Sequence, residues 1–362
     1  MYLYLSELQR ENNRIEIYNK TKCQNKFVMS KTLYLFYKFY NEYIFMLLRS
    51  SLFQEFPISQ RLNKFLKANY LPESYIDWAK DHFQPVLDLI VENHKKKPNS
   101  TQIFGINGCQ GSGKTTLASF ICEYISAKLD IQAIALSMDD FYLTRSQRQN
   151  LAQRIHRLLL VRGVPGTHDV DLALSTINSL IKGDNTLIPR FDKSEDDRII
   201  KSKLIKTSGS VKLIIIEGWC FGARPQTETQ LQKPINDLEK KFDANGIYRK
   251  YVNGCLSDKY QRLFEVVDYL LMLKAPSFKS VYKWRLEQEH KLRERIHTES
   301  NKTENSHVMT DTEVWDFIQY FQRITEECLS EMPARANFLY ELDDSRKIKF
   351  RPSNYKSVTR LE

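Results

Sequence analysis

The sequence predicts an α/β fold in which a mostly parallel sheet has helices on both faces. The first observation is that short apolar segments, typical of buried strands, alternate with segments whose apolar residues recur at helical spacing. The second is a glycine-rich loop between one such strand and one such helix. The expected strands cover residues 102–107, 131–136, 187–191, 211–216, 266–273 and 338–342.

The expected helices begin and end at recognisable signals. The first follows the segment 71–74, which has a proline early and an acidic residue in the first turn. It ends at a basic run before Pro98, because cations suit a helix C-terminus and proline stops the helix. A further helix follows the glycine-rich loop, and others are expected over 146–160, 170–182, 277–297 and 311–330, with a polar loop at 299–308.

Residues 1–58 are expected to form an N-terminal helical extension to one large domain at 59–362. The most apolar segment of the chain, 33–48, lies in this extension, and polar residues at positions 38, 41 and 42 interrupt it on one helix face. Crossing a bilayer takes about 20 apolar residues. We therefore expect an amphipathic helix and no stable membrane insertion.

The net charge and the cysteine content indicate which kind of partner the protein binds and in which compartment it lies. The net charge of +10 and pI of about 9.1 favour an anionic partner, but the basic residues are dispersed and no nucleic-acid-binding motif is present. We expect a small anionic substrate and no nucleic acid. Six cysteines without a CxxC pair, and an N-terminus without a signal-peptide pattern, predict a cytoplasmic protein. The oligomeric state stays open.

The glycine-rich loop is a complete phosphate-binding motif, GxxxxGK[ST], running from Gly108 to Thr115. Its glycines let backbone N–H groups surround a β-phosphate, while Lys114 would reach the β- and γ-phosphates and Thr115 would bind Mg²⁺. The motif predicts ATP and Mg²⁺ as ligands, within a P-loop NTPase three-layer sandwich. The expected ATP-binding residues are Gly108, Cys109, Gln110, Gly111, Ser112, Gly113, Lys114, Thr115 and Thr116.

Acidic residues follow two of the expected strands, at the sheet edge where parallel α/β folds bind ligands. Asp139 is expected to be the catalytic base that takes the proton of an attacking hydroxyl group. Asp140 is an alternative base or a Mg²⁺ ligand, and both residues could instead cap a turn. Glu217 would help Thr115 to hold the metal ion.

Two polar segments are expected to bind the acceptor. The first, 162–169, supplies Arg162, His168 and Asp169, although Asp169 could simply cap the next helix. The second, 189–198, supplies Lys193 and Arg198, although such a charge run is often a solvated face.

A helical lid at 277–310 would bring Arg285 over the transferred phosphate as a catalytic group. The alternative for this segment is an exposed amphipathic helix stabilised by ion pairs between successive turns.

In order after GINGCQGSGKTTL, the segments SMDDFYLT, RGVPGTHD, IPRFDKSEDDR, IIIEGW and WRLEQEHKL resemble the plant-type P-loop D-glycerate 3-kinases and their microbial relatives. That group is similar to the uridine kinase, phosphoribulokinase and pantothenate kinase superfamily. The resemblance covers residues 71–342 and implies ATP-dependent phosphorylation of D-glycerate to 3-phospho-D-glycerate. It implies that Asp139 is the base, that Lys193, Arg198 and His168 face the substrate carboxylate, and that Tyr142 belongs to the substrate site.

Two alternatives remain open from the residues alone. One is a kinase for another hydroxylated metabolite, such as a nucleoside or a pantothenate-like acid. The other is a P-loop ATPase that is not a kinase, although no clear set of water-activating and sensor residues is present.

Overall fold

The computed structural model describes residues 60–200, 203–298 and 308–352, all within one compact unit, Pro57–Glu362. The predicted N-terminal extension and residues 299–307 of the predicted loop lie outside these ranges. Within them, no helix is both long enough and apolar enough to cross a bilayer.

A six-stranded sheet forms the centre of the fold, in the order β10-β9-β8-β1-β7-β2. All neighbouring strands are parallel except β10, which runs antiparallel to β9. Every residue of β1 and β7 is buried, which explains why these segments are continuously apolar. The predicted mostly parallel sheet is confirmed, but the segment at 187–191 lies outside it and β10 was not predicted. The strands of the sheet are β1 (Gln102–Gly108), β2 (Ala133–Ser137), β7 (Leu213–Gly218), β8 (Tyr269–Lys274), β9 (Phe338–Leu342) and β10 (Ile348–Phe350).

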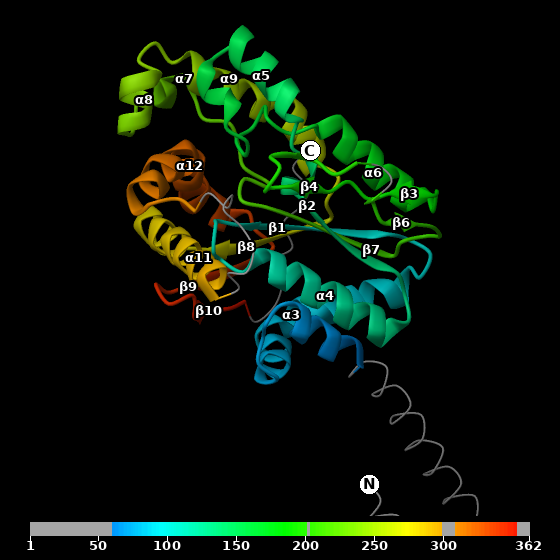
Figure 1. Ribbon diagram of the computed structural model, residues 1–362. Helices are drawn as coiled ribbons and strands as arrows, with labels where there is room; N and C mark the ends of the chain where they lie inside the picture. The colour runs from blue at the N-terminus through cyan, green and yellow to red at the C-terminus, as the bar shows by residue number, and fades with distance from the viewer. Residues whose placement is uncertain (1–59, 201–202, 299–307, 353–362) are drawn as a thin grey trace, which may run out of the picture. The chain divides into compact units, whose positions relative to one another are not determined.

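Helices cover both faces of the sheet, with α3 and α4 on one side and α6 and α12 on the other (Figure 1). Strand β1 lies between β7 and β8, so the loop that follows it opens at the middle of the sheet edge. The labelled helices are α3 (Ser74–Lys96), α4 (Lys114–Leu129), α5 (Arg145–Arg154), α6 (Val170–Lys182), α7 (Glu228–Leu231), α8 (Asp237–Phe242), α9 (Ile247–Cys255), α10 (Gln261–Phe264), α11 (Phe278–Thr298) and α12 (Asp311–Glu331), and residues 60–68 are helical as well.

Two predicted elements are divided in the structure. The strand expected at 187–191 is split between β3 (Thr186–Leu187), which pairs with β6 (Lys206–Thr207), and β4 (Phe191–Asp192), which pairs with β5 (Asp197–Arg198). Pro189 lies between them and has no N–H group for a strand ladder. The helix expected at 146–160 is interrupted after α5, and a 3₁₀ turn follows over Arg157–Leu160.

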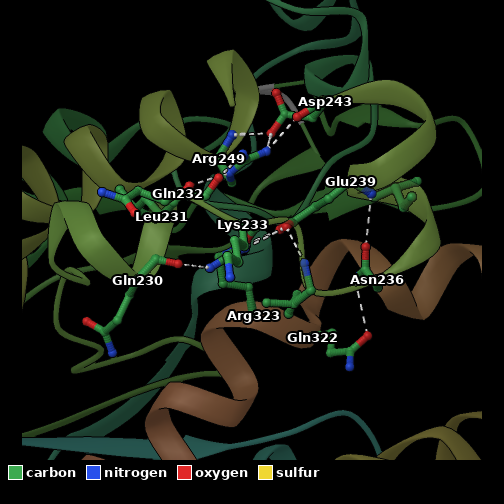
Figure 2. Close-up of polar contacts among 12 residues, drawn as sticks. Gln230, Leu231, Gln232, Lys233, Asn236, Glu239, Asp243, Arg249, Gln322 and Arg323 are labelled. Carbon is green, nitrogen blue, oxygen red and sulfur yellow. Dashed lines mark hydrogen bonds and ion pairs between the residues drawn. The ribbon is translucent and has the colours of Figure 1, made fainter. Parts of the chain in front are cut away.

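Two buried arginines hold the segment between β7 and β8 in place, and one of them, Arg323, connects it to helix α12 (Figure 2). Arg323 of α12 binds Glu239 through two hydrogen bonds of 2.8 and 2.6 Å, and Arg249 of α9 pairs with Asp243 at 3.0 Å. The same two guanidinium groups donate hydrogen bonds to the backbone carbonyl oxygens of four successive residues, 230–233. These carbonyls belong to the last two residues of the short helix α7 and the two residues after it, so the arginines satisfy carbonyl groups that the helix end leaves without partners.

Candidate active site

The phosphate-binding loop joins β1 to α4 and depends on glycine at two positions. Gly111 and Gly113 have φ angles of +78° and +87°, a region that residues with a side chain rarely adopt. A Cβ atom on Gly111 would also lie 2.8 Å from the Cβ of Trp284 in α11. The loop therefore lies close against α11, while its backbone turns into the N-terminus of α4, where N–H groups are free to bind an anion.

An acid on the neighbouring strand lies directly behind this loop. The Thr115 hydroxyl group donates a 2.8 Å hydrogen bond to Glu217 Oε1 at the end of β7. The other carboxylate oxygen, Oε2, is buried without a hydrogen-bond partner and lies 4.0 Å from Lys114 Nζ. A hydroxyl oxygen beside an unsatisfied carboxylate oxygen fits Mg²⁺, which prefers oxygen ligands. The described residues hold no group of three His, Cys, Asp or Glu side chains that could bind a metal ion. In kinase sites Mg²⁺ is commonly held by one or two protein oxygens together with phosphate oxygens and water.

The phosphate loop opens into a polar cavity of about 280 Å³. The cavity brings together nine of the residues singled out from the sequence, namely Gln110, Gly111, Lys114, Thr115, Asp139, Tyr142, Arg162, Lys193 and Arg285. Outside its lining lie Gly108, Cys109, Ser112, Gly113, Thr116, Asp140, His168, Asp169, Arg198 and Glu217. Segments from five parts of the chain therefore meet at the carboxyl end of the sheet.

Asp139 follows β2 and has a partner on each carboxylate oxygen. The Tyr142 hydroxyl group donates a 2.6 Å hydrogen bond to Oδ1, and Lys193 Nζ lies 2.7 Å from Oδ2. Burial by itself raises the pKa of Asp139, but the charges of Lys193 and Lys114 and these two hydrogen bonds lower it to about 2. Asp139 is therefore ionised near neutral pH.

Three cations face the cavity together with Lys114 of the phosphate loop. Arg162 is paired with Asp196, and its guanidinium group lies 5.5 Å from the ring centroid of Phe191. Arg285 Nη1 lies 2.6 Å from Glu289 Oε2 on the next turn of α11. Lys193 extends from the turn between β4 and β5, and 61% of its side chain is exposed. The cavity lining therefore carries four cations and one acid, Asp139, and this excess of cationic groups favours an anionic ligand.

Asp140 does not line the cavity, although it was a candidate for the same metal ion as Thr115. It forms an ion pair with Arg190 and accepts a 3.3 Å hydrogen bond from the backbone N–H of Phe191. These contacts attach the β4–β5 hairpin to the end of β2. Among the acids next to the phosphate loop, Glu217 has the contact with Thr115 that Asp140 lacks.

Asp169 and Arg198 contact each other outside the cavity lining. Asp169 caps α6 by accepting a hydrogen bond from Leu172 N, which is the alternative role that its position suggested. Its second oxygen pairs with Arg198 at 3.0 Å, and Arg198 Nε also donates to the backbone oxygen of Tyr142. The pair therefore connects the two predicted acceptor segments.

His168 is buried behind Tyr142. Its ring lies 4.8 Å from that of Tyr142, and Nδ1 is hydrogen-bonded to the Tyr260 hydroxyl group at 2.6 Å. Burial lowers the pKa of His168 to about 4, so the imidazole is neutral near pH 7. His168 therefore packs against Tyr142 and lies outside the cavity lining, with its Nε2 buried without a hydrogen-bond partner.

Four further cavity residues were not singled out from the sequence: Trp219, Gln288, Phe317 and Phe321. Trp219 directly follows Gly218 at the end of β7. Because ligands bind at the ends of parallel strands, this position could have indicated that Trp219 lines the site. Phe317 and Phe321 are one helical turn apart on α12, and Trp219 packs edge-on against Phe321 at 5.0 Å. The sequence around Phe317 and Phe321 predicts a helix but does not indicate that this helix face lines the cavity.

Comparison with known proteins identifies the kind of enzyme. No protein-family profile matches the chain. The chain is 34% identical over 248 residues to the uncharacterized kinase mug58 of Schizosaccharomyces pombe, which covers 65% of this chain and 85% of that protein. It is 28% identical over 236 residues to the chloroplastic D-glycerate 3-kinase of Arabidopsis thaliana, covering 60% of this chain and 46% of that protein.

A solved structure has the same fold. The D-glycerate 3-kinase from Cryptococcus neoformans var. grubii aligns with a TM-score of 0.61 and 21% identity, covering 78% of this chain and 99% of that one. The phosphate loop and the acid after β2 are the parts that a kinase needs, and the similarity to the Schizosaccharomyces pombe kinase extends over most of that protein. The chain belongs to the P-loop kinase family of the uridine kinase superfamily, and it is an ATP-dependent kinase that phosphorylates a hydroxyl group.

Proposed function

We propose that the chain transfers the γ-phosphate of ATP to the 3-hydroxyl group of D-glycerate and forms 3-phospho-D-glycerate. The observation that carries the proposal is that Asp139 shares one small cavity with Lys114 of the phosphate loop and with two further cations, Arg162 and Lys193. A base beside a phosphate site needs a hydroxyl group, and the cations favour an acceptor that is also an anion. The two relatives named D-glycerate 3-kinase agree with this acceptor.

The phosphate loop would hold the nucleotide. Backbone N–H groups around Gly111 and Gly113 would bind the β-phosphate, and Lys114 would contact the β- and γ-phosphates. Thr115 and Glu217 would hold Mg²⁺ directly or through water. Bound there, the ion would neutralise charge that develops on the phosphate oxygens during transfer.

The transfer requires few covalent changes. The 3-hydroxyl oxygen forms a bond to the γ-phosphorus, and the bond from that phosphorus to the β–γ bridging oxygen breaks, so ADP leaves. Asp139 accepts the proton of the hydroxyl group. Arg285 lines the cavity and would stabilise the negative charge on the transferred group.

The two cations beside Asp139 would orient the acceptor. A carboxylate bound by Arg162 and Lys193 leaves the far end of a three-carbon hydroxy acid free to approach Asp139. The aromatic wall formed by Trp219, Phe317 and Phe321 bounds the same space and favours a short acceptor. Another small hydroxy acid is the second candidate, since it would use the same cations.

The direct test is an acceptor panel. Purified protein with Mg²⁺ and ATP is given D-glycerate, L-glycerate, other hydroxy acids, pantothenate and nucleosides, and ADP formation is measured. We expect the highest kcat/KM with D-glycerate. A higher kcat/KM with a nucleoside than with every hydroxy acid would overturn the proposal.

The role of Asp139 is tested by Asp139→Asn, which keeps the size of the side chain and removes its ability to take a proton. We expect kcat to fall by about 10²- to 10⁴-fold while ATP affinity is retained. Asp140→Asn is the matched control, because Asp140 lies next in sequence but does not line the cavity. Normal turnover by Asp139→Asn would show that another group is the base.

A further inference from the structure

The arginine on α11 that faces the cavity is paired with an acid that does not line it. Arg285 belongs to the cavity lining, whereas Glu289, one helical turn further along α11, lies outside it. The Glu289 side chain is only 4% exposed, and its Oε2 lies 2.6 Å from Nη1 of Arg285. A buried carboxylate is therefore in direct contact with a cation that faces the substrate space.

The stability of the helix does not explain this pair. An acid four residues before a base stabilises a helix best, and Arg285 and Glu289 have the opposite order. Glu287 and Lys291 on the same helix have the favoured order, and both are exposed. Burying an ion pair also costs desolvation energy, so apolar residues of similar size often give equal or greater stability. The buried pair therefore calls for a role other than stability.

The carboxylate of Glu289 is held in place by a contact that does not involve Arg285. Its Oε1 accepts a 2.8 Å hydrogen bond from the backbone N–H of Met309. Met309 directly precedes Thr310, the N-cap residue of α12, and its backbone oxygen accepts a 2.9 Å hydrogen bond from Arg293 of α11. Glu289 is therefore a fixed point between the two helices.

Arg285 is oriented from two sides. Glu289 contacts Nη1, and the guanidinium carbon lies 5.9 Å from the ring centroid of Phe317 on α12. A guanidinium group has several N–H donors, so an ion pair through one nitrogen leaves others for a phosphate. Building on the role of Arg285 in the proposed function, we propose that Glu289 is a positioning residue that fixes this guanidinium group in the cavity before phosphate transfer.

A carboxylate beside a catalytic cation can have the opposite effect, which is to screen its charge. If Glu289 only screened Arg285, its removal would make the cavity more positive and would speed phosphate transfer or tighten ATP binding. A positioning carboxylate has the reverse effect on kcat, because a long side chain that is free to rotate has to be ordered in the transition state. The sign of the change in kcat therefore separates the two effects.

The test variant is Glu289→Gln, which keeps an oxygen for the Met309 N–H group and removes the charge. We expect kcat to fall about tenfold, which corresponds to about 1.4 kcal/mol, while ATP affinity is retained. The acceptor is the one with the highest kcat/KM in the panel. Lys291→Met is the control, because it breaks an ion pair on the same helix without changing the cavity lining, and it should leave kcat unchanged.

A second background shows whether Glu289 acts through Arg285. Arg285→Met should lower kcat at least about tenfold. Adding Glu289→Gln to Arg285→Met should cause no further loss of kcat, because no guanidinium group is left to orient. The same addition should raise the midpoint of thermal unfolding, because it removes a buried carboxylate that has lost its partner. An equal fall in kcat in both backgrounds would mean that Glu289 acts only through the connection between α11 and α12, and it would overturn the proposal.

The outcomes separate this inference from the proposed function. An unchanged or higher kcat in Glu289→Gln overturns the positioning role and leaves the proposed function standing. An unchanged kcat in Arg285→Met removes both residues from catalysis, whichever acceptor is used. If the panel favours an acceptor other than D-glycerate, the proposed function fails, and the same kcat comparisons with that acceptor still decide the role of Glu289. A fall in kcat that disappears in the Arg285→Met background supports the inference.

Discussion

The Thr115 hydroxyl group donates a 2.8 Å hydrogen bond to Glu217 Oε1, and this bond connects the phosphate loop to the end of the adjacent strand β7. The second oxygen of Glu217 is buried without a hydrogen-bond partner. A buried, unsatisfied carboxylate oxygen is costly unless a ligand contacts it. The pair is therefore arranged to receive a cation that arrives with the nucleotide.

Replacing this acid should weaken the metal site without unfolding the protein. Glu217→Gln keeps an oxygen for the Thr115 hydroxyl group but removes the negative charge. We expect the Mg²⁺ concentration for half-maximal activity to rise about 10- to 100-fold. Activity is measured over a Mg²⁺ titration at saturating ATP, with the exposed residue Glu92 changed to Gln as the control. An unchanged Mg²⁺ requirement would remove Glu217 from the metal site.

The close contact between the phosphate loop and α11 predicts a strong effect of one methyl group. Gly111→Ala puts a Cβ atom 2.8 Å from the Cβ of Trp284 at a φ of +78°, so the loop has to shift. We expect ATP affinity, measured by calorimetry, to fall at least about tenfold. Gly254→Ala is the matched control, because a Cβ there meets nothing within 4 Å and the residue lies in helix α9. Equal ATP affinity in both variants would contradict the proposed loop contact.

The buried imidazole of His168 predicts a loss of stability in mild acid. Its pKa is lowered to about 4 by burial, so the unfolded chain binds this proton at higher pH than the folded chain does. The free energy of unfolding should therefore decrease by roughly 3 kcal/mol as pH falls from the unfolded histidine pKa of about 6.5 to about 4. The lowered pKa of Asp139, about 2 against an ordinary value of 3.8, acts below this window.

Urea denaturation at several pH values measures this dependence. His168→Asn retains a polar group near the Tyr260 hydroxyl group but does not titrate. We expect the variant to lose less stability than the wild type between neutral pH and pH 4.5. Parallel curves for the two proteins would show that His168 is not the group responsible.

The buried pair of Arg323 and Glu239 predicts a large stability effect far from the chemistry. Arg323→Met leaves Glu239 buried without its partner and removes donors from the carbonyls of Gln230 and Lys233. We expect the free energy of unfolding to fall by about 3–5 kcal/mol. Thermal and urea denaturation measure the change.

Two controls separate burial from charge. Lys240→Met breaks an exposed pair with Asp237 and should change stability by less than about 0.5 kcal/mol. Adding Glu239→Leu to Arg323→Met should recover part of the loss, because no charge is then left buried. A double variant less stable than Arg323→Met would contradict this explanation.

Local patterns in the sequence predicted much of the phosphate-binding half of the site. The motif from Gly108 to Thr115 is contiguous, the strand before it is buried throughout, and the helix after it is rich in apolar residues. Asp139 and Glu217 could be singled out because each follows a buried strand, and parallel strands end at the same sheet edge. The structure brings all of these elements to that edge.

The part of the site that would bind the acceptor was less predictable from the sequence, because its residues come together through contacts between distant segments. Neither the contact of Lys193 with Asp139 nor the pairing of Asp140 with Arg190 has a local signal, since 54 and 50 residues separate the partners. Phe317 and Phe321 close the cavity only because α12 packs over Trp219. A periodic pattern shows that one helix face is buried, but it does not show what covers that face.

The sequence by itself determined that this chain has a parallel α/β sheet with a phosphate loop, because glycine spacing, strand hydrophobicity and acidic strand ends are properties of neighbouring residues. Only the tertiary structure decided which cations share a cavity with Asp139, that His168 is enclosed and neutral, and that α12 forms a wall. Those features depend on contacts between distant segments, where burial and ion pairing set both position and charge.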